Sequence, residues 1–458
     1  MKDFEIRRLL IAEDLCRRIE KTLACEAYMV GGATRAIVVG EPIADIDITV
    51  GGGISDLLKS DEFPVVDESG LRFGSCRIKF HEEIFDVTAM RGSERWDGGE
   101  LRSFERTVDT KTDAGRRDFT INAGYMRVED GGKIVIHDPL DAFWEALAKR
   151  EIRFVGNPVD RIREDPLRML RAFRISAQMG WDIEPASQKA IVDSVGLVAD
   201  IPPERVRGEL NKLLLVPCYR IGPAMKRMYT CGLLVHILPE LHFAMTVEQN
   251  KHHGETVGEH LLLTVSAVRK RNLLLRWAAL LHDIAKPKTK VFSKKKQDFT
   301  FYNHEVESAF DAKMIMRRLK FSNREIDYVF RLIFHHMFYI SKNTKPSTIR
   351  HRMRLVGPDK IRDLLRLRIA DRAGNLAKES GITYHLKLLL RMIRKVERDD
   401  MALKVTDLKF RGHDAMALGL KGPEIGKLLT YLLERCIANP GLNRLPTLRK
   451  LAKEWRVD

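Results

Sequence analysis

The stretch ADIDITVGG, residues 44–52, places two aspartates, Asp45 and Asp47, inside a run of residues that otherwise form strands. Isoleucine, threonine and valine favour β-strands, whereas aspartate is depleted from them. Because residues i and i+2 point to the same face of a strand, the two carboxylates would lie side by side. They repel each other unless a cation lies between them, and Mg²⁺ prefers carboxylate oxygens. The spacing predicts a metal site; a strand end tipped with solvated acids is the alternative.

A glycine pair lies upstream of this strand. Gly31 and Gly32 follow a short apolar strand, AYMV, and begin the segment GGATRAIVVG, which we expect to form a helix ending at Gly40. Glycines let backbone N–H groups approach a phosphate, the N-terminus of a helix favours an anion, and Arg35 adds a positive charge. The order of strand, glycine pair, helix and Asp-x-Asp strand therefore predicts a site for phosphates and metal.

A third acid, Asp86, lies in residues 71–90, which we expect to form a β-hairpin. The second arm of this hairpin alternates, so that Asp86 lies on one face and Phe85 and Val87 on the other. Asp86 is a candidate third carboxylate, and a half-exposed strand acid is the alternative.

Composition limits the class of protein. The 458 residues predict roughly two to four domains. The chain has 79 Lys+Arg against 63 Asp+Glu, a net charge of +16, which favours a polyanionic partner and nucleic acid first. No run reaches the roughly 20 apolar residues of a membrane span, so no membrane partner is expected. Six cysteines without a CxxC pair fit a reducing, cytoplasmic location. The N-terminal 23 residues have the pattern of an amphipathic helix and not of a signal peptide.

The pattern changes along the chain from mixed to helical. Residues 92–115 are polar and contain glycine, and we expect a mobile loop there. From about residue 158 helical periodicity dominates, with one helix ending at Gly180. A second apolar helix, NLLLRWAALLHDIAKP, is expected to close at Pro287 and to be followed by a basic loop over 286–296.

Six motifs occur in a fixed order. They are VGGATR (30–35), DIDI (45–48), FDVTAMR (85–91), GRRDFTINAG (115–124), EDPLRMLRAFR (164–174) and ERVRGEL (204–210). Over roughly the first 215 residues the chain thus resembles the class II tRNA nucleotidyltransferase and bacterial poly(A) polymerase family. The resemblance implies a polymerase-β-like head, whose paired aspartates hold metal ions for nucleotidyl transfer, and a helical neck.

The resemblance also implies roles for individual residues. Asp45 and Asp47 are the implied catalytic metal ligands, and we add Asp86 as a third catalytic candidate. Asp165 and Arg168 are the implied base-reading pair. The nucleotide-binding candidates are Gly31, Gly32, Arg35, Arg117, Asp118, Asn122, Asp165, Arg168, Arg171 and Arg174.

The residues of the neck support this reading physically. Asp165, Arg168, Arg171 and Arg174 recur every three residues, so on one helix they form a slowly drifting stripe. A carboxylate and a guanidinium fork can match the Watson–Crick edges of C and A and reject those of U and G. The alternative is a solvated face held by helical ion pairs.

The sequence departs from the family pattern at two places. Ala36 stands where the family usually has an acid after the arginine of GGxxR, and TKTDAG replaces an acidic approach to Arg116 and Arg117. The paired aspartates are unaffected, and the changes bear on nucleotide selection and on the hinge of the 92–115 loop.

A second group of residues lies in the helical part. His260, His282, Asp283 and Asp371 follow the order H…HD…D, which resembles the HD phosphohydrolase superfamily and implies a divalent metal. His304, His335 and His336 lie between them. Imidazole ligands favour Mn²⁺, Co²⁺ or Ni²⁺ over Mg²⁺. An HD domain followed by a tail such as GHDAMALGLKGPEIGKLL occurs in some bacterial CCA-adding enzymes. It can be active or purely architectural.

Together these observations predict an α+β chain with four parts. The parts are a polymerase-β-like head with a mixed sheet at 1–155, a helical neck at 156–245, an HD domain at 246–376 and a helical tRNA-binding tail at 377–458. The expected function is addition of CCA to tRNA 3′ ends from CTP and ATP, with Mg²⁺ in the head and without a nucleic-acid template. Addition of CC, A or poly(A) by an enzyme of the same family is the nearest alternative. An HD metal-dependent phosphohydrolase acting on nucleotide or RNA ends is the alternative of another class, and a non-catalytic RNA-binding module is a third. Both a monomer and a dimer fit the sequence.

Overall fold

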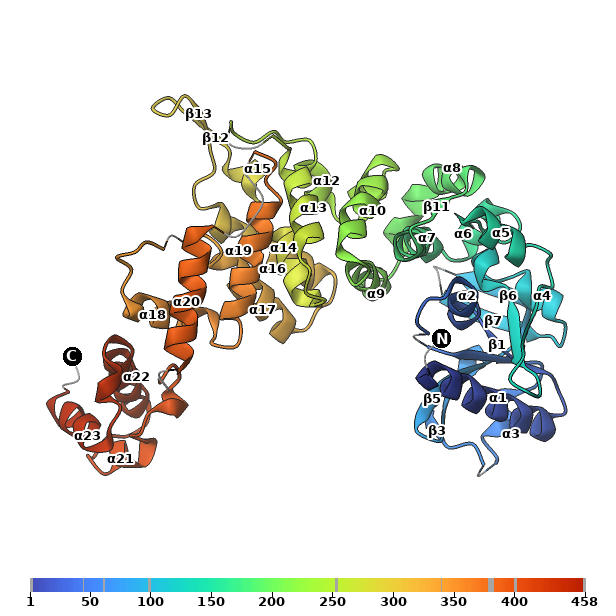
Figure 1. Cartoon of the computed structure of the whole chain (residues 1–458), viewed down its shortest axis with the longest axis horizontal. Coiled ribbons are helices and arrows are strands. Elements are labelled where there is room, and N and C mark those ends of the chain that lie inside the picture. Colours follow the sequence, from blue (N-terminus) through green and yellow to red (C-terminus); the bar gives the residue numbers. More distant parts are fainter. Residues whose placement is uncertain are drawn as a thin grey trace. The chain divides into compact units, whose positions relative to one another are not determined.

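The structure is a computed structural model (Figure 1). It describes residues 3–43, 45–60, 62–97, 100–251, 254–338, 340–377, 383–398 and 402–455. The chain divides into two compact units. The first comprises Met1–Val216 and Ala224–Ile237, and the second comprises Pro217–Pro223 and Leu238–Asp458.

A seven-stranded mixed sheet forms the head of the first unit, in the order β3-β4-β5-β2-β1-β8-β9. Its strands are β1 (Ala27–Val30), β2 (Asp47–Val50), β3 (Val65–Asp67), β4 (Ser75–Phe80), β5 (Glu83–Ala89), β8 (Tyr125–Val128) and β9 (Ile134–His137). Strands β2 and β5 pair in parallel, and the other neighbours pair antiparallel. The helices beside it are α1 (Asp3–Leu23), α2 (Gly32–Val39), α3 (Ile54–Leu57), α4 (Thr110–Ala114) and α5 (Phe143–Lys149).

The alternation of side chains gives the sheet one core face and one polar face. Ile48 and Val50 of β2 and Phe85 and Val87 of β5 pack in one cluster with the apolar residues of α1. The residues between them, including Asp47 and Asp86, point to the opposite face. The hairpin predicted at 71–90 and the alternation of its second arm are confirmed by β4 and β5.

The prediction of a mobile loop over 92–115 is wrong. The chain forms a two-stranded hairpin of β6 (Arg91–Asp97) and β7 (Glu100–Arg106), followed by α4. Partners distant in sequence hold this polar segment: the Arg91 guanidinium lies 5.1 Å from the centroid of the Phe104 ring and donates to the carbonyl oxygen of Phe73. Local composition could not reveal contacts of this kind.

A bundle of helices completes the first unit. They are α6 (Pro158–Glu164), α7 (Leu167–Met179), α8 (Pro185–Ser194), α9 (Pro203–Leu214), α10 (Cys218–Thr230) and α11 (Leu234–Ile237). The expected single helix through the neck motif is broken at Asp165, which is extended, because a residue before proline disfavours the helical conformation. The end at Gly180 is confirmed, and this glycine is left-handed with φ 71°.

The second unit consists of helices and one small hairpin among the described residues. They are α12 (Pro239–Ala244), α13 (Val257–Ala267), α14 (Leu273–Leu281), α15 (Lys286–Thr289), α16 (His304–Arg318), α17 (Asn323–Phe334), α18 (Pro346–Val356), α19 (Ile361–Ala373), α20 (Tyr384–Arg398), α21 (Gly412–Met416), α22 (Pro423–Ala438) and α23 (Leu445–Glu454). The last three helices share an apolar core that includes Phe410, Leu428 and Leu448. No helix among the described residues is long and apolar enough to cross a membrane.

Two expectations for this unit are corrected. Helix α14 ends at Leu281 and not at Pro287, because the chain turns at His282, whose Nδ1 donates to the carbonyl of Ala279. The expected basic loop over 286–296 is the short helix α15 followed by a hairpin of β12 (Val291–Ser293) and β13 (Asp298–Thr300), seen at the edge of the unit in Figure 1.

Candidate active site and candidate metal centre

Two carboxylates lie next to each other on the polar face of the head sheet. Asp47, the first residue of β2, is paired with Asp86 of β5 in the parallel register. Asp45 lies exposed just before β2, so it belongs to the loop and not, as expected, to the strand. Nε of Arg77 donates to Asp86 at 2.7 Å, whereas no hydrogen bond to Asp47 is present among the described residues. Asp47 is therefore the carboxylate that lacks a positive partner.

The charge of Asp47 is unfavourable in this setting. Burial first, and then the carboxylates of Asp86 and Asp45, raise the pKa of Asp47 to about 6. A divalent cation would remove this repulsion, and three carboxylates are the ligands that Mg²⁺ prefers. Carboxylates are thus the right type of ligand, but the carboxylate oxygens of Asp45, Asp47 and Asp86 do not all lie within 4.8 Å of one another.

The glycine turn lies against the same aspartate. Gly31 has φ +73°, a conformation that favours glycine, and a Cβ added to it would lie 3.4 Å from Oδ2 of Asp47. Gly32 begins α2, as predicted. The backbone at this turn therefore lies directly against the Asp47 carboxylate.

Arg35 on α2 is buried and reaches across to the RRDFTIN segment. Its Nη1 donates to Oδ1 of Asn122, and its Nε is buried without a hydrogen-bond partner among the described residues. Burial, and next the charge of Arg174, lower the pKa of Arg35 to about 10, so it remains a cation at neutral pH. An unsatisfied buried guanidinium N–H suits an anionic ligand.

Arg117 is fixed by two partners. Its guanidinium donates to Oδ2 of Asp113 at 2.9 Å and to the hydroxyl of Tyr125 at 3.1 Å, and that hydroxyl donates to the same Asp113 oxygen at 2.5 Å. Asp113 belongs to the TKTDAG segment that departs from the family pattern. This segment supplies a buried acid that orients Arg117.

The neck residues form pairs that the sequence did not indicate. Asp118 accepts from Arg171 at 2.8 Å. Burial opposes ionisation of Asp118, but Arg171 outweighs it and lowers the pKa of Asp118 to about 2. Asp165 accepts from Arg205 at 2.8 Å, and Arg168 donates to Glu164 at 2.6 Å. The implied base-reading pair is thus held by two separate partners.

These side chains line one cavity of about 390 Å³ in the first unit. Of the candidates, Asp47, Arg117, Asp118, Asp165, Arg168 and Arg171 line it. The other candidates of the first unit, Asp45, Asp86, Gly31, Gly32, Arg35, Asn122 and Arg174, are not among its lining residues. Arg174 is instead paired with Glu209 at 2.6 Å.

Five charged lining residues were not among the candidates named from the sequence: Arg91, Glu94, Asp113, Arg116 and Arg205. Arg205 lies in ERVRGEL, a motif that was noted but given no role. Arg91, the last residue of the FDVTAMR motif, and Glu94, in the segment expected to form a loop, both lie on β6. Glu94 pairs with Arg116, which also donates to the carbonyl of Gly92.

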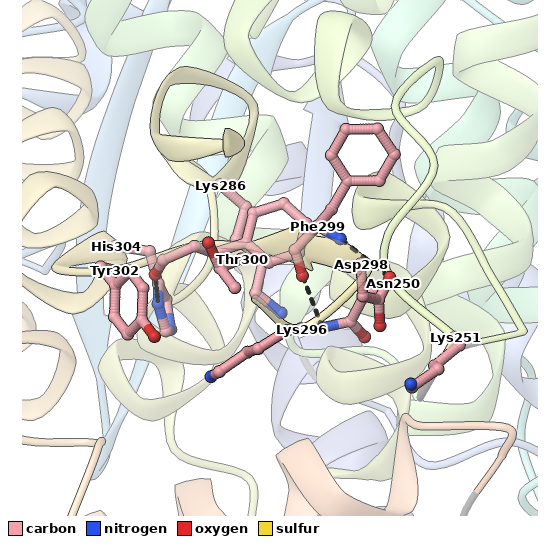
Figure 2. A pocket seen from close by; sticks show the side chains of 10 residues that line it. Asn250, Lys251, Lys286, Lys296, Asp298, Phe299, Thr300, Tyr302 and His304 are labelled. Atoms are coloured by element: carbon pink, nitrogen blue, oxygen red, sulfur yellow. Dashed lines mark hydrogen bonds between the residues drawn. The ribbon is translucent and has the colours of Figure 1, made fainter. Parts of the chain in front are cut away.

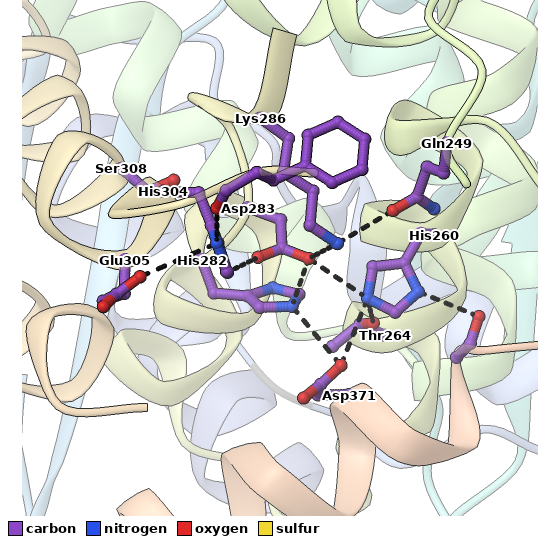
Figure 3. A network of polar contacts seen from close by, with 12 residues as sticks. Gln249, His260, Thr264, His282, Asp283, Lys286, His304, Glu305, Ser308 and Asp371 are labelled. Atoms are coloured by element: carbon purple, nitrogen blue, oxygen red, sulfur yellow. Dashed lines mark hydrogen bonds and ion pairs between the residues drawn. The ribbon is translucent and has the colours of Figure 1, made fainter. Parts of the chain in front are cut away.

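A second centre lies in the second unit, around Asp283 (Figure 3). Nε2 of His260 and of His282 lie 3.5 Å and 3.3 Å from Oδ2 of Asp283. Nε2 of His304 and of His336 lie 3.2 Å and 3.6 Å from Oδ1. Oδ1 of Asp371 lies 3.3 Å from Nε2 of His260 and 3.7 Å from Nε2 of His282. The four candidates H…HD…D are therefore brought together, and His304 and His336 join them.

The four imidazoles share one orientation. In each, Nδ1 lies within hydrogen-bond distance of a backbone carbonyl: Gly374 for His260, Ala279 for His282, Phe301 for His304 and Ile333 for His336. A carbonyl only accepts, so Nδ1 carries a proton in each ring, and Nε2 is the nitrogen that faces the carboxylates. This outer shell is the one that prepares imidazoles to bind a metal.

Two groups capable of holding a metal ion share Asp283. One contains His260 and His282, and the other contains His304 and His336. Nε2 of His282 and Oδ1 of Asp283 are buried without a hydrogen-bond partner among the described residues, although each has an oppositely charged atom nearby. Burial disfavours the His282 imidazolium, but Asp283 and Asp371 outweigh it and raise the pKa of His282 to about 10. Both the orphaned atoms and this excess negative charge fit a divalent cation.

Two further features of this centre were not predicted. Nζ of Lys286 lies 2.6 Å from Oδ2 of Asp283 and donates to Gln249 at 2.8 Å. A cavity of about 330 Å³ reaches Asp283, His304, His336 and Asp371. His335, noted beside His336, is not among its lining residues.

Comparison with known protein families gives three matches along the chain. Residues 27–153 match the Poly A polymerase head domain, and residues 180–245 match the probable RNA and SrmB-binding site of polymerase A. Residues 250–379 match the HD domain.

Solved structures and curated relatives agree with these matches. The CCA-adding enzyme of Bacillus stearothermophilus, solved with CTP, has a TM-score of 0.67 at 22% identity, covering 99% of this chain and 98% of that chain. This likeness shows the fold, and it confirms the α+β architecture. The CCA-adding enzyme of Lacticaseibacillus paracasei is 36% identical over 192 residues, 41% of this chain and 46% of that protein. The chain thus spans about half the length of that relative.

One relative matches over most of its length. The A-adding tRNA nucleotidyltransferase of Deinococcus radiodurans is 31% identical over 367 residues, which make up 76% of this chain and 81% of that protein. The chain therefore belongs to the family of tRNA nucleotidyltransferases and poly(A) polymerases, as its motifs predicted, and it carries an HD domain.

Proposed function

We propose that this protein adds CCA to the 3′ ends of tRNA, using CTP and ATP and no nucleic-acid template. One observation carries the proposal: a single cavity brings the partnerless carboxylate Asp47 together with the arginines and acids of the RRDFTIN and neck motifs. Relatives named CCA-adding and A-adding enzymes support the reaction class.

In this proposal one set of head residues binds the metal ion and another binds the triphosphate. Asp45, Asp47 and Asp86 hold Mg²⁺, which when bound stabilises the attacking and leaving oxygens of an in-line displacement. Arg35 and the N–H groups at Gly31 and Gly32 bind the triphosphate. The 3′ oxygen of the RNA forms a bond to the α-phosphorus, the bond to the pyrophosphate oxygen breaks, and pyrophosphate leaves.

Base choice is assigned to the neck. Asp165 accepts from the amino group that C and A both carry on their Watson–Crick edge, and Arg168 donates to a ring nitrogen or carbonyl. Because Arg205 and Glu164 hold these two side chains, their spacing is set before a nucleotide binds. U and G present a carbonyl where the carboxylate needs a donor, so they are rejected.

The range of addition is the finer part of the proposal. Relatives of this chain carry the names of both CCA-adding and A-adding enzymes. The β6–β7 hairpin contributes Arg91 and Glu94 to the cavity wall, which supports a complete site that takes both nucleotides. We also place the reaction in the cytoplasm, because six free cysteines suit a reducing compartment.

The test is incorporation of each labelled nucleotide, offered singly and together, into tRNA that lacks its 3′ end. Wild type should add two C residues from CTP and one A when ATP is also present. Asp47→Ala and Asp45→Ala should each reduce incorporation by about a thousandfold or more with tRNA affinity nearly unchanged. If either variant retains near-wild-type incorporation, the assignment of Asp45 and Asp47 as catalytic metal ligands is wrong.

A second candidate function belongs to the HD centre. We propose that it hydrolyses phosphoesters at RNA ends, such as a terminal 2′,3′-cyclic phosphate. The convergence of four imidazole Nε2 atoms on the two carboxylate oxygens of Asp283 favours it, since a purely architectural His-Asp pair needs no such set. A divalent ion such as Mn²⁺, Co²⁺ or Ni²⁺, when bound, would supply Lewis-acid activation. The oxygen of water bonds to phosphorus, the bond to one ribose oxygen breaks, and that oxygen takes up a proton.

This second function has its own test. Wild type should hydrolyse a 2′,3′-cyclic nucleotide with one of these ions, and His282→Ala with Asp283→Ala should not. Incorporation of CTP and ATP by the double variant should remain, which also shows that it is folded. If wild type shows no metal-dependent hydrolysis, the HD region serves only as scaffold.

A further inference from the structure

The hairpin β12–β13 carries an unusual surface. Six lysines and no acid lie between residues 286 and 297. Three large side chains near them are exposed: Phe292 by 51%, Phe299 by 38% and Tyr302 by 67%. Phe292 and Phe299 are cross-strand partners whose ring centroids lie 5.5 Å apart. Exposed aromatic rings gathered on one element mark an interaction surface rather than a core.

Lysines accompany these rings closely. Nζ of Lys290 lies 4.3 Å from the centroid of Phe299, and Nζ of Lys296 lies 5.2 Å from that of Tyr302. Lys294, Lys295 and Lys296 have no carboxylate within ion-pair distance among the residues that the structure describes, and they form the turn between the strands. Rings that stack on bases, interleaved with cations that contact phosphates, are how proteins bind single-stranded nucleic acid.

A cavity of about 530 Å³ lies beside the hairpin (Figure 2). Its lining residues are Asn250, Lys251, Lys286, Lys296, Asp298, Phe299, Thr300, Phe301, Tyr302 and His304. Lysines thus outnumber acids in its wall, where Asp298 is the one carboxylate among the described residues. The volume lies within the range of sites for small ligands.

This cavity is connected to the HD centre by two residues. Lys286 and His304 line both it and the cavity that reaches Asp283 and Asp371. Both are bonded to the centre: Nζ of Lys286 lies 2.6 Å from Oδ2 of Asp283, and Nε2 of His304 lies 3.2 Å from Oδ1. A nucleotide whose base stacks at Tyr302 would therefore direct its phosphate past Lys286 and His304 toward Asp283.

We infer that the hairpin and its cavity form a binding platform for the single-stranded 3′ end of an RNA and present its terminal phosphate to the HD centre. This inference rests on the proposed hydrolytic function for the delivery step, whereas the binding step stands on the hairpin alone. It adds that the HD centre takes an RNA end with a lower KM than a free nucleotide.

The first test is binding of a fluorescein-labelled RNA hexanucleotide ending in a 2′,3′-cyclic phosphate to the full chain, with EDTA and increasing salt. Lys294→Gln with Lys295→Gln should weaken binding and reduce the salt slope by about 1.4, since each phosphate contact on a single strand contributes about 0.7. Lys149→Gln with Lys189→Gln removes the same charge from α5 and α8 and should leave both unchanged. A hairpin variant with the slope of wild type overturns the platform.

The second test separates stacking from charge. Tyr302→Leu should weaken binding of the hexanucleotide by about tenfold or more, because the stacking surface is lost, and Tyr302→Phe should bind as wild type does. A duplex of equal length should bind more weakly than the single strand, because its bases are not available. Tyr302→Leu binding like wild type, or equal affinity for the duplex, contradicts the platform.

The third test distinguishes failure of the platform from failure of the HD function. With Mn²⁺, Tyr302→Leu should raise KM for the cyclic-ended hexanucleotide by about tenfold with kcat unchanged. If wild type binds the RNA through the hairpin but hydrolyses nothing, the binding platform stands and the HD function fails. If wild type hydrolyses the hexanucleotide and the hairpin variants match it in KM, the HD function stands and the platform is overturned.

Discussion

Oδ2 of Asp165 accepts a hydrogen bond of 2.8 Å from Arg205 on α9, while Arg168, three residues along the chain from Asp165, is paired with Glu164. The carboxylate that the family resemblance assigns to base reading is thus oriented by a residue forty positions away. Its geometry depends on the packing of α9 against α7 and not on the neck motif alone.

This relationship predicts a selectivity defect at Arg205. In Arg205→Met the Asp165 carboxylate loses its partner and its fixed orientation, so discrimination against UTP and GTP should fall by roughly tenfold, with a smaller loss for CTP and ATP. The measurement is kcat/KM for each of the four nucleotides. Glu204→Gln, at the exposed neighbouring position, should leave all four unchanged. An equal loss for all four nucleotides would instead mean that Arg205 only supports the fold.

The raised pKa of Asp47 predicts that this catalytic carboxylate lowers the stability of the metal-free head. Its pKa is about 3.9 in an unfolded chain and about 6 in the metal-free head. The folded state therefore binds more protons between these values, and the free energy of unfolding falls as pH rises from about 4 to 6, by about 1–3 kcal/mol. Asp47→Asn should remove this loss, so in EDTA at pH 7 the variant should have the higher Tm. Mg²⁺ should raise the Tm of wild type and not that of the variant. A lower Tm for Asp47→Asn in EDTA would contradict the repulsion.

Glu94 and Arg116 predict a coupled effect on stability. The Glu94 side chain is 6% exposed and pairs with both Arg116 and Arg91. Glu94→Gln removes the carboxylate that both arginines share and should destabilise the head by about 3 kcal/mol, whereas Arg116→Met should cost less, because Arg91 still pairs with Glu94. The double variant should cost less than the sum, with a coupling of about 0.5–3 kcal/mol in urea unfolding. Additive costs would show that the hairpin is not fixed through this pair.

The shared carboxylate of the HD centre predicts a metal stoichiometry. Titration calorimetry with Ni²⁺, which imidazoles bind well, should show two ions in the second unit, one in each histidine pair. His304→Asn with His336→Asn should reduce the count by one, and Asp283→Asn should abolish both. Retention of both ions in Asp283→Asn would separate the sites from this aspartate.

Sequence reasoning reached furthest where a local pattern determines the structure. The alternation in 84–89 placed Asp86 on the polar face, because a strand repeats every two residues. The glycine pair and the left-handed Gly40 fixed the bounds of α2. Likewise, His260, His282, Asp283 and Asp371 meet because each lies at or near the end of a helix of a compact bundle.

Predictions from the sequence were wrong where contacts between distant segments determine the structure. The β6–β7 hairpin has few apolar residues, and its strands are held through Phe73 and Arg116, which no local window contains. The pairing of Asp165 with Arg205 depends on helix packing for the same reason. The two short strands of the β12–β13 hairpin were not predicted, because lysine is depleted from strands and this segment is rich in lysine. The cross-strand pair of Phe292 and Phe299 favours the strands, but it becomes visible only in the structure.

The parallel register of β2 and β5 limits how this chain can change in length. One residue inserted into β5 after Ile84 would turn each later side chain of the strand to the opposite face, so Phe85 and Val87 would leave the core and Asp86 would enter it. Deletions there would have the same effect, and only a pair of insertions would restore the facing. The lysines between β12 and β13 lie in a turn, where an added residue does not change which face of a strand the other side chains occupy. Homologous chains should therefore vary in length at this turn and keep a constant length between Ile84 and Ala89.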